Sequence, residues 1–180
     1  MNIGTLKGKT IAEEKELLAP IVRRFLETHP ISDDVISVVE IDPTLSDTAA
    51  FCAEYGVESK QAANCVIIEV KRGEDVWYVA CVVLADTKVD VNGLLKKHLD
   101  VRKASFAPME KAVEMTGMEF GAITPIGLPS TWNIIIDSRV VQADKVIIGS
   151  GIRKSKLIIK GSILKDLPNV TVLQDLGIIK

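Results

Sequence analysis

The sequence contains few of the residues from which metal centres and disulfide frameworks are built. Its 180 residues include three cysteines and two histidines. Cys52, Cys65 and Cys81 form no CxxC pair, and because an odd number cannot pair completely, we expect reduced thiols in apolar surroundings. His29 and His98 stand alone, whereas a zinc site needs several ligands close together, so both are interpreted as surface residues. The sequence therefore predicts neither a metal site nor a cofactor.

The chain also lacks a long apolar run and a strong excess of charge of either sign. No stretch approaches the length of a membrane span, and the first residues, MNIGTLKGKT, lack the apolar core of a signal peptide. We expect a cytoplasmic protein that does not enter a membrane. The formal net charge of −2 gives no overall attraction to nucleic acid, so any such binding must come from a local basic patch.

Familiar catalytic signatures are missing as well. The sequence has no GxGxxG, GxxxxGK(S/T), HExxH or GxSxG motif. Gly149-Ser150-Gly151 is similar to half of a phosphate-binding loop, but the rest of that motif is absent and the signal is weak. A tight turn between the short apolar runs 146–148 and 157–159 is the favoured interpretation.

What remains is typical of one folded domain, with 47% hydrophobic and 26% charged residues. Helices are expected at about 11–28, at 46–55, from Asp90, and from Pro108 to Thr116. Strands are expected at 35–41, 62–70, 76–85, 132–136, 146–148, 157–159 and 170–173. Helices lie among strands without regular alternation, which predicts a single α/β (or α+β) domain over 1–180. Its mixed, mostly antiparallel sheet would be surrounded by helices.

Two segments carry most of this prediction. Thr10 and Glu13 have the spacing of a capping box, and the apolar residues that follow repeat at helical intervals up to His29-Pro30, which predicts the N-terminal helix of about 11–28. The runs 62–70 and 76–85 are joined by a charged turn that contains glycine and predict a hairpin. Because both runs are almost continuously apolar, they are expected to be central strands covered on both faces.

Two polar residues of this hairpin are candidate site residues. Asn64 interrupts an apolar strand, and a buried amide without partners costs on the order of 1–3 kcal/mol. It either bonds neighbouring backbone at the start of the strand or points into a pocket. Asp86 ends the partner strand, where a carboxylate can line a ligand crevice or can serve as a turn or cap residue near Asp90.

The segment GAITPIGL, residues 121–128, is apolar and poor in large side chains, with two glycines and one proline. Glycine lets backbone approach a ligand closely and proline holds a loop in place, so the segment can form one wall of a small pocket. It can equally be a rigid connector to the next strand.

Two basic clusters can contact phosphates or can be ordinary solvated surface. The first comprises Lys96, Lys97, His98, Arg102 and Lys103. The second comprises Arg153, Lys154, Lys156 and Lys160.

The order of these features resembles the YbaK/ProX family of aminoacyl-tRNA editing domains, which also occurs as an insertion in bacterial prolyl-tRNA synthetases. The resemblance runs through SDTAAFCAEYGVESKQAANCVIIEV, YVACVVLADTKVDVNGLLKKHL, RKASFAPMEKAVEMTGMEFGAITPIGL and NIIIDSRVVQADKVIIGSGIRKSKLII, and covers roughly residues 30 to 165. Its most specific part is the pattern formed by Thr116, Gly117, Gly121, Pro125 and Gly127.

This resemblance implies a compact domain whose pocket receives the 3′ end of a charged tRNA. Members hydrolyse the ester that joins a wrong amino acid to the terminal ribose, and the candidate substrates here are cysteinyl- or alanyl-tRNA for proline. The implied partners are the aminoacyl-tRNA 3′ end and an aminoacyl-tRNA synthetase. The N-terminal helix and the tail VLQDLGIIK carry apolar residues that could pack internally or across a dimer, so a monomer and a homodimer both stay open.

The candidate site residues combine this resemblance with the residues singled out above from the sequence itself. The candidate catalytic residues are Asn64, Gly121 and Pro125. The candidate substrate-binding residues are Asp86, Thr116, Gly117, Ala122, Ile123, Thr124, Gly127, Gly149, Ser150 and Gly151. The candidates for contact with the tRNA backbone are Lys96, Lys97, Arg153 and Lys154.

Asn64 is the important departure, because the family usually has a lysine at this strand position. Asparagine can donate and accept hydrogen bonds but has no charge. Lys60, four residues earlier, has the same strand parity and could approach from the pocket edge. Three alternatives follow: an editing enzyme with an altered substrate, a tRNA- or synthetase-binding relative without catalysis, and a different small-molecule hydrolase. A partner-binding domain that keeps the fold alone is a further possibility.

Overall fold

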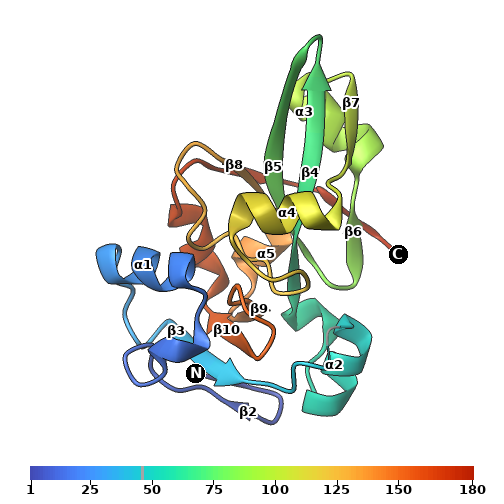
Figure 1. Ribbon diagram of the computed structural model, residues 1–180. Coiled ribbons are helices and arrows are strands. Elements are labelled where there is room, and N and C mark those ends of the chain that lie inside the picture. The colour runs from blue at the N-terminus through green and yellow to red at the C-terminus, as the bar shows by residue number, and fades with distance from the viewer. Residues whose placement is uncertain (46) are drawn as a thin grey trace.

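Two β-sheets form the centre of the protein, whose computed structural model describes residues 1–45 and 47–180 (Figure 1). The five-stranded sheet has the order β11 (Val170–Leu173), β8 (Asn133–Asp137), β5 (Asp75–Leu84), β4 (Ala63–Arg72) and β7 (Lys103–Phe106). The three-stranded sheet has the order β3 (Ile36–Glu40), β10 (Ser155–Ile159) and β9 (Val146–Gly149). Two short ribbons pair β1 (Asn2–Ile3) with β2 (Leu6–Lys7), and β6 (Thr87–Val89) with β12 (Gly177–Ile179).

The helices lie around these sheets. They are α1 (Pro20–Thr28), α2 (Thr48–Tyr55), α3 (Lys96–Leu99), α4 (Met109–Thr116) and α5 (Ser138–Gln142), with shorter helical segments η1 (Lys15–Leu17), η2 (Ser59–Gln61), η3 (Val91–Leu95) and η4 (Gly161–Asp166). Strands β5, β8 and β11 are parallel to one another, and the remaining pairs are antiparallel. The predicted single domain with a mixed, mostly antiparallel sheet and surrounding helices is therefore confirmed.

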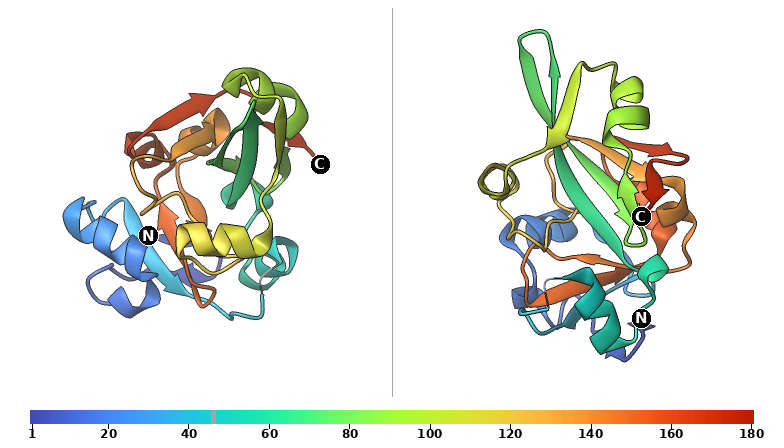
Figure 2. Two further views of the ribbon diagram at one scale, coloured as in Figure 1. Left: turned by 45° about the horizontal axis from the view of Figure 1, so that its top comes forward. Right: turned by 90° about the vertical axis from the view of Figure 1, so that its right-hand side faces the viewer.

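The β4–β5 hairpin is central, as its continuous apolar sequence predicts. The strands pair residue by residue from Ala63 opposite Leu84 to Arg72 opposite Asp75. Side chains alternate between the faces of a strand, and here both faces are buried. Even-numbered residues of β5, such as Val82, pack into the core beneath α4, and odd-numbered ones, such as Cys81, pack into a second core beneath η3. The hairpin tip projects from one end of the molecule, whereas α2 and the β1–β2 ribbon lie at the other (Figures 1 and 2).

The N-terminal helix is shorter than predicted, so its expected start near residue 11 is wrong. The capping box is present, since the Thr10 hydroxyl and backbone amide both donate to the Glu13 carboxylate. It closes a turn, however, and α1 begins at Pro20. Proline has no backbone N–H and suits the first helical position, so a helix running through residue 20 would lose a hydrogen bond.

The other predicted helices have the expected ends. Asp47 caps α2 by accepting a hydrogen bond from the Ala49 amide, and Gly56 ends this helix with a φ of +63°. Ser46, proposed as part of the same start, lies outside the described residues. The carboxylate of Asp90 caps η3, a π-helical turn that continues into α3.

The two sheets meet at the start of β4, which positions the candidate site. Ala62 forms a parallel bridge with Ile147 of β9. Strand β7 pairs with β4 at residues 68–71, farther along the same strand. Residues 63–67 therefore lie between a strand of the second sheet and α4, next to the loop that follows this helix.

Candidate functional site

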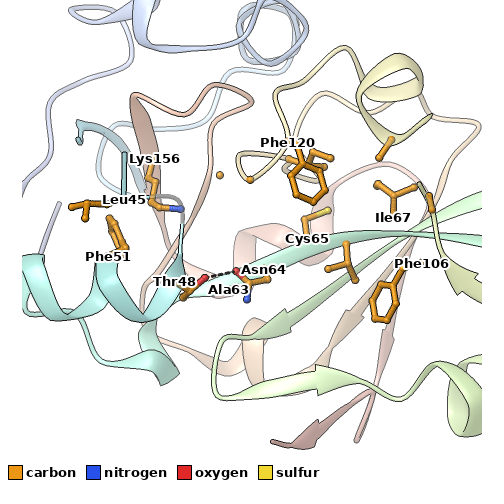
Figure 3. Close-up of a pocket in the computed structure, with 16 residues that line it drawn as sticks. Leu45, Thr48, Phe51, Ala63, Asn64, Cys65, Ile67, Phe106, Phe120 and Lys156 are labelled. Carbon is orange, nitrogen blue, oxygen red and sulfur yellow. Dashed lines mark hydrogen bonds between the residues drawn. The ribbon is translucent and has the colours of Figure 1, made fainter. Parts of the chain in front are cut away.

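A cavity of about 400 Å³ opens along the first half of β4 (Figure 3). Its walls come from α2, β4, the end of β7, α4, the loop after α4, β9 and β10. The lining residues are Leu45, Thr48, Phe51, Ala63, Asn64, Cys65, Val66, Ile67, Phe106, Ala107, Ala112, Phe120, Gly121, Ile123, Gly149 and Lys156. This volume is within the usual range for small-molecule sites. The lining is mostly apolar, with polar side chains at three positions.

Asn64 is one of these polar side chains, so the prediction that it faces a pocket agrees with its placement. The Thr48 hydroxyl, on the first turn of α2, donates a hydrogen bond of 3.4 Å to the Asn64 carbonyl oxygen (Figure 3). This contact orients the side-chain amide of Asn64 and occupies its oxygen as a hydrogen-bond acceptor. Within the described part of the chain, the amide N–H groups are then available as donors to a ligand.

The segment 121–128 forms one wall of the cavity through Gly121 and Ile123. It is held against the 149–151 turn, because the Gly151 amide donates to the Ala122 carbonyl at 2.8 Å. Gly149 permits this close approach. A Cβ at Gly149 would lie 2.4 Å from the Ala122 carbonyl oxygen, nearer than real Cβ contacts allow. Four predicted site residues, Asn64, Gly121, Ile123 and Gly149, are thus brought together.

The rest of the specific pattern supports this wall from behind. Pro125 is buried and does not line the cavity. Gly127, with a φ of +95°, packs against the backbone of Ile21 in α1. The Thr116 hydroxyl donates to the Ala112 carbonyl at 2.7 Å, and Gly117 ends α4 in the left-handed conformation. These contacts fix the helix end and the loop that follows it.

Other predicted substrate-binding residues lie off the cavity. The Ser150 hydroxyl is buried and bonds the Ser155 hydroxyl at 2.6 Å. Ala122 and Gly151 contribute the backbone hydrogen bond that closes the loop. Among the described residues, the Thr124 hydroxyl and one oxygen of Asp86 are buried without a hydrogen-bond partner. A substrate-binding role for these residues stays a prediction.

The predicted phosphate-binding residues divide between two places. Lys96 and Lys97 are on α3, which belongs to the layer covering the opposite face of the five-stranded sheet from α4. Arg153 borders a small recess that adjoins the cavity, and its guanidinium donates to the Pro43 carbonyl at 3.1 Å. Lys154 is exposed beside it. The second cluster therefore lies closer to the cavity than the first.

Lys156 is a cavity residue that the sequence placed in a surface cluster. It is half-buried, and its ammonium nitrogen lies 4.9 Å from the centre of the Phe51 ring. Burial lowers the pKa of Lys156 from its ordinary value, and the neighbouring Cys52 thiol acts in the opposite direction. The available signal was its position directly before the predicted strand 157–159. In the structure β10 begins at Ser155, and the alternation of side chains places Lys156 on the same face as the buried Ile158.

Two aromatic rings at the cavity were also missed. Phe106 and Phe120 line it although these residues are 60% and 51% exposed. Exposed rings beside a pocket can stack on nucleic acid bases, which contributes about 1–3 kcal/mol per base. Phe106 lies in β7, a strand that the sequence did not predict.

Candidate metal-binding clusters and candidate membrane-spanning helices were both looked for in the described residues. In residues 1–45 and 47–180, no group of three or more His, Cys, Asp or Glu side chains could hold a metal ion. Within the same ranges, no helix has the length and apolar character needed to span a membrane.

Solved structures share this fold at low sequence identity. A proposed trans-editing enzyme for prolyl-tRNA synthetase superposes with a TM-score of 0.72 and 19% identity, over 87% of this chain and 97% of its own. The hypothetical protein APE2540 has a TM-score of 0.74 and 19% identity, over 86% and 97%. A scaffold protein for grafted epitopes has a TM-score of 0.73 and 17% identity, over 87% and 95%. These likenesses establish the fold.

Sequence comparison identifies the family. No curated protein matches the sequence. The model of the aminoacyl-tRNA editing domain matches residues 42–167, more than half of the chain. The matched range contains the whole cavity lining, from Leu45 to Lys156. The chain belongs to the aminoacyl-tRNA editing domain family.

Proposed function

We propose that the protein hydrolyses the aminoacyl ester of mischarged tRNA as a separate, trans-acting editing enzyme. The observation that carries this proposal is the cavity in which Asn64, the Gly121 loop and Gly149 converge, in a chain of the editing family. Its dimensions suit the end of a tRNA, namely one ribose with its amino acid. The exposed rings of Phe106 and Phe120 offer stacking surfaces for the adjoining unpaired bases.

No nucleophile–base pair is found among the described residues that line the cavity, which is compatible with this chemistry. An aminoacyl ester is an activated bond, and the ribose carries a neighbouring hydroxyl that can position water. The protein then has to orient the ester and stabilise the developing oxyanion with fixed donors. The Asn64 amide and the backbone N–H groups of Gly121 and Ile123 are the candidate donors at the cavity wall.

The apolar part of the cavity favours a small, uncharged amino acid. Ile67, Ala112 and Ile123 line it, and none of the described lining residues has a carboxylate that could pair with a basic side chain. Alanine and cysteine attached to the proline tRNA are the substrates we propose. A second checking site is useful for them because one methylene changes binding to an apolar pocket by about 1–3 kcal/mol.

Asn64 supports one alternative function, a module that binds aminoacyl-tRNA or a synthetase without hydrolysing the ester. Editing domains usually carry a lysine at this position, and the structure has an uncharged amide there. Binding would persist through stacking and phosphate contacts while catalysis is lost.

A deacylation assay tests both functions. The wild type, Asn64→Lys and the control Asn92→Lys, which adds the same charge at an exposed position on η3, are incubated with alanyl-, cysteinyl- and prolyl-tRNA for proline. Hydrolysis of a mischarged tRNA above its spontaneous rate by the wild type supports editing. Activity confined to Asn64→Lys, with gel retardation of charged tRNA by the wild type, supports the binding module. If no variant hydrolyses or retards any of these tRNAs, both functions are refuted.

A further inference from the structure

Lys156 lies at a position on β10 that faces a hydrophobic core, where an apolar side chain would be expected. Side chains alternate along the strand, so Lys156 and Ile158 share a face, and Ile158 is fully buried in the core that contains Phe51. The lysines that flank the strand, Lys154 and Lys160, are exposed. A lysine on the core face is therefore a placement that packing alone does not explain.

The pairing register provides the space for this side chain. Lys156 lies opposite Gly149 on β9 and opposite Val39 on β3. Residues directly opposite each other on neighbouring antiparallel strands project to the same face, and Gly149 has no side chain to fill that space. The lysine side chain lines the cavity. Figure 3 shows it together with the side chain of Asn64, which lines the same cavity.

The ammonium group in this position is incompletely solvated and lacks an anionic partner among the residues that the structure describes. Lys156 takes part in none of the ion pairs formed among residues 1–45 and 47–180. Its neighbours are Leu45 and the ring of Phe51, with the Cys52 thiol as the titratable group nearby. A desolvated cation gains free energy when an anionic oxygen enters its site.

We infer that the Lys156 ammonium binds negative charge of the substrate inside the cavity, and so supplies from β10 a cation that Asn64 cannot supply from β4. This inference rests on the proposed function. The negative charge has two sources, which are the phosphate of the terminal nucleotide and the oxyanion that develops on the ester carbonyl. The phosphate is present in the bound ground state, whereas the oxyanion forms only in the transition state.

Steady-state deacylation by Lys156→Met, Lys156→Arg and the double variant Asn64→Lys/Lys156→Met tests the inference. Lys165→Met, which removes one exposed charge from η4, is the matched control. We expect Lys156→Met to lower kcat/KM by about tenfold or more, because a hydrogen bond to a charged group is lost. Lys156→Arg and the double variant should recover most of the activity, since each restores a cation at the cavity.

The kinetic constants distinguish the two sources of charge. A raised KM with unchanged kcat identifies the phosphate, and a lowered kcat identifies the oxyanion. Unfolding in urea distinguishes a role of Lys156 in substrate binding from a role in stabilising the fold. Removal of a desolvated charge should leave Lys156→Met at least as stable as the wild type, whereas a lysine needed for the fold would leave it less stable. Unchanged kcat and KM in Lys156→Met overturn the inference.

A binding assay separates the failure of this inference from failure of the proposed function. If the wild type hydrolyses no ester, the editing proposal fails, and binding of the trinucleotide CCA decides the role of Lys156. A loss of affinity of about tenfold in Lys156→Met, recovered in Lys156→Arg, supports the inference. Equal affinity of the wild type and Lys156→Met for the trinucleotide, in that case, refutes it.

Discussion

Replacement of Gly149 by alanine should displace the loop wall of the cavity. The added Cβ would lie 2.4 Å from the Ala122 carbonyl oxygen and 2.7 Å from that of Ile123, and ordinary contact begins at 3.4 Å. The loop must therefore move by about 1 Å (3.4 − 2.4), because both obstructing atoms belong to the backbone and cannot rotate away. Overpacking of this kind costs about 1–3 kcal/mol of stability.

The effect on catalysis should exceed the effect on folding. A displacement of about 1 Å in a positioning element can reduce the rate on the order of 100-fold. Deacylation of the preferred mischarged tRNA, measured at a temperature where the variant is folded, checks this expectation. Gly73→Ala is the control, because Gly73 has a φ of +59° at the hairpin tip with no atom near its added Cβ. It should lose stability through backbone strain and retain activity.

Two outcomes would refute this reasoning. The first is Gly149→Ala with wild-type kcat/KM, which would mean that the loop position does not control the reaction. The second is an equal loss of activity in Gly149→Ala and Gly73→Ala when the same fraction of each variant is folded. The loss of activity would then come from lower stability and not from the position of the loop.

Three further predictions concern titratable groups. Burial alone would raise the pKa of Asp137, but hydrogen bonds from the Arg139 side chain and from the Gly177 and Arg139 amides bring it below its ordinary value. Asp137→Asn should therefore lower the free energy of unfolding by about 2–3 kcal/mol at neutral pH, and urea titrations should show this difference shrinking as the pH falls through the folded-state pKa. Burial raises the pKa of the Cys81 thiol to about 12, so iodoacetamide should modify it only in denaturant. Deacylation corrected for spontaneous hydrolysis should decline as the pH rises through the lowered pKa of Lys156, and Lys156→Arg should not show this decline at the same pH.

Much of the fold could be predicted because its signals are local. The capped helices α2 and α4 and the apolar β4–β5 hairpin depend on residues close together in the chain. The missed strands depend on distant partners instead. Strand β7 forms by pairing with residues 68–71 of β4, and β12 by pairing with β6. Neither β7 nor β12 carries an alternating pattern long enough to predict a strand by itself.

The candidate site shows the same division. Asn64 interrupts an apolar strand, and the glycine-containing segment 121–128 is conspicuous in composition, so both could be selected as candidates from the sequence. The family resemblance also placed them, together with Gly149, in one pocket. The contributions of Thr48 and Lys156 could not be predicted, because these residues reach the cavity from two other parts of the chain.

The sequence by itself determined the helices α2 and α4, the central hairpin and the resemblance to editing domains, because these follow from short-range periodicity, capping and motif order. The tertiary structure alone decided which polar groups share the cavity. Lys156 lies in it because the register of β10 places Gly149 opposite and Ile158 on the same face. A shift of one residue in that register would turn the lysine to the other face of the sheet. Such pairing depends on contacts across the folded core, which no local pattern specifies.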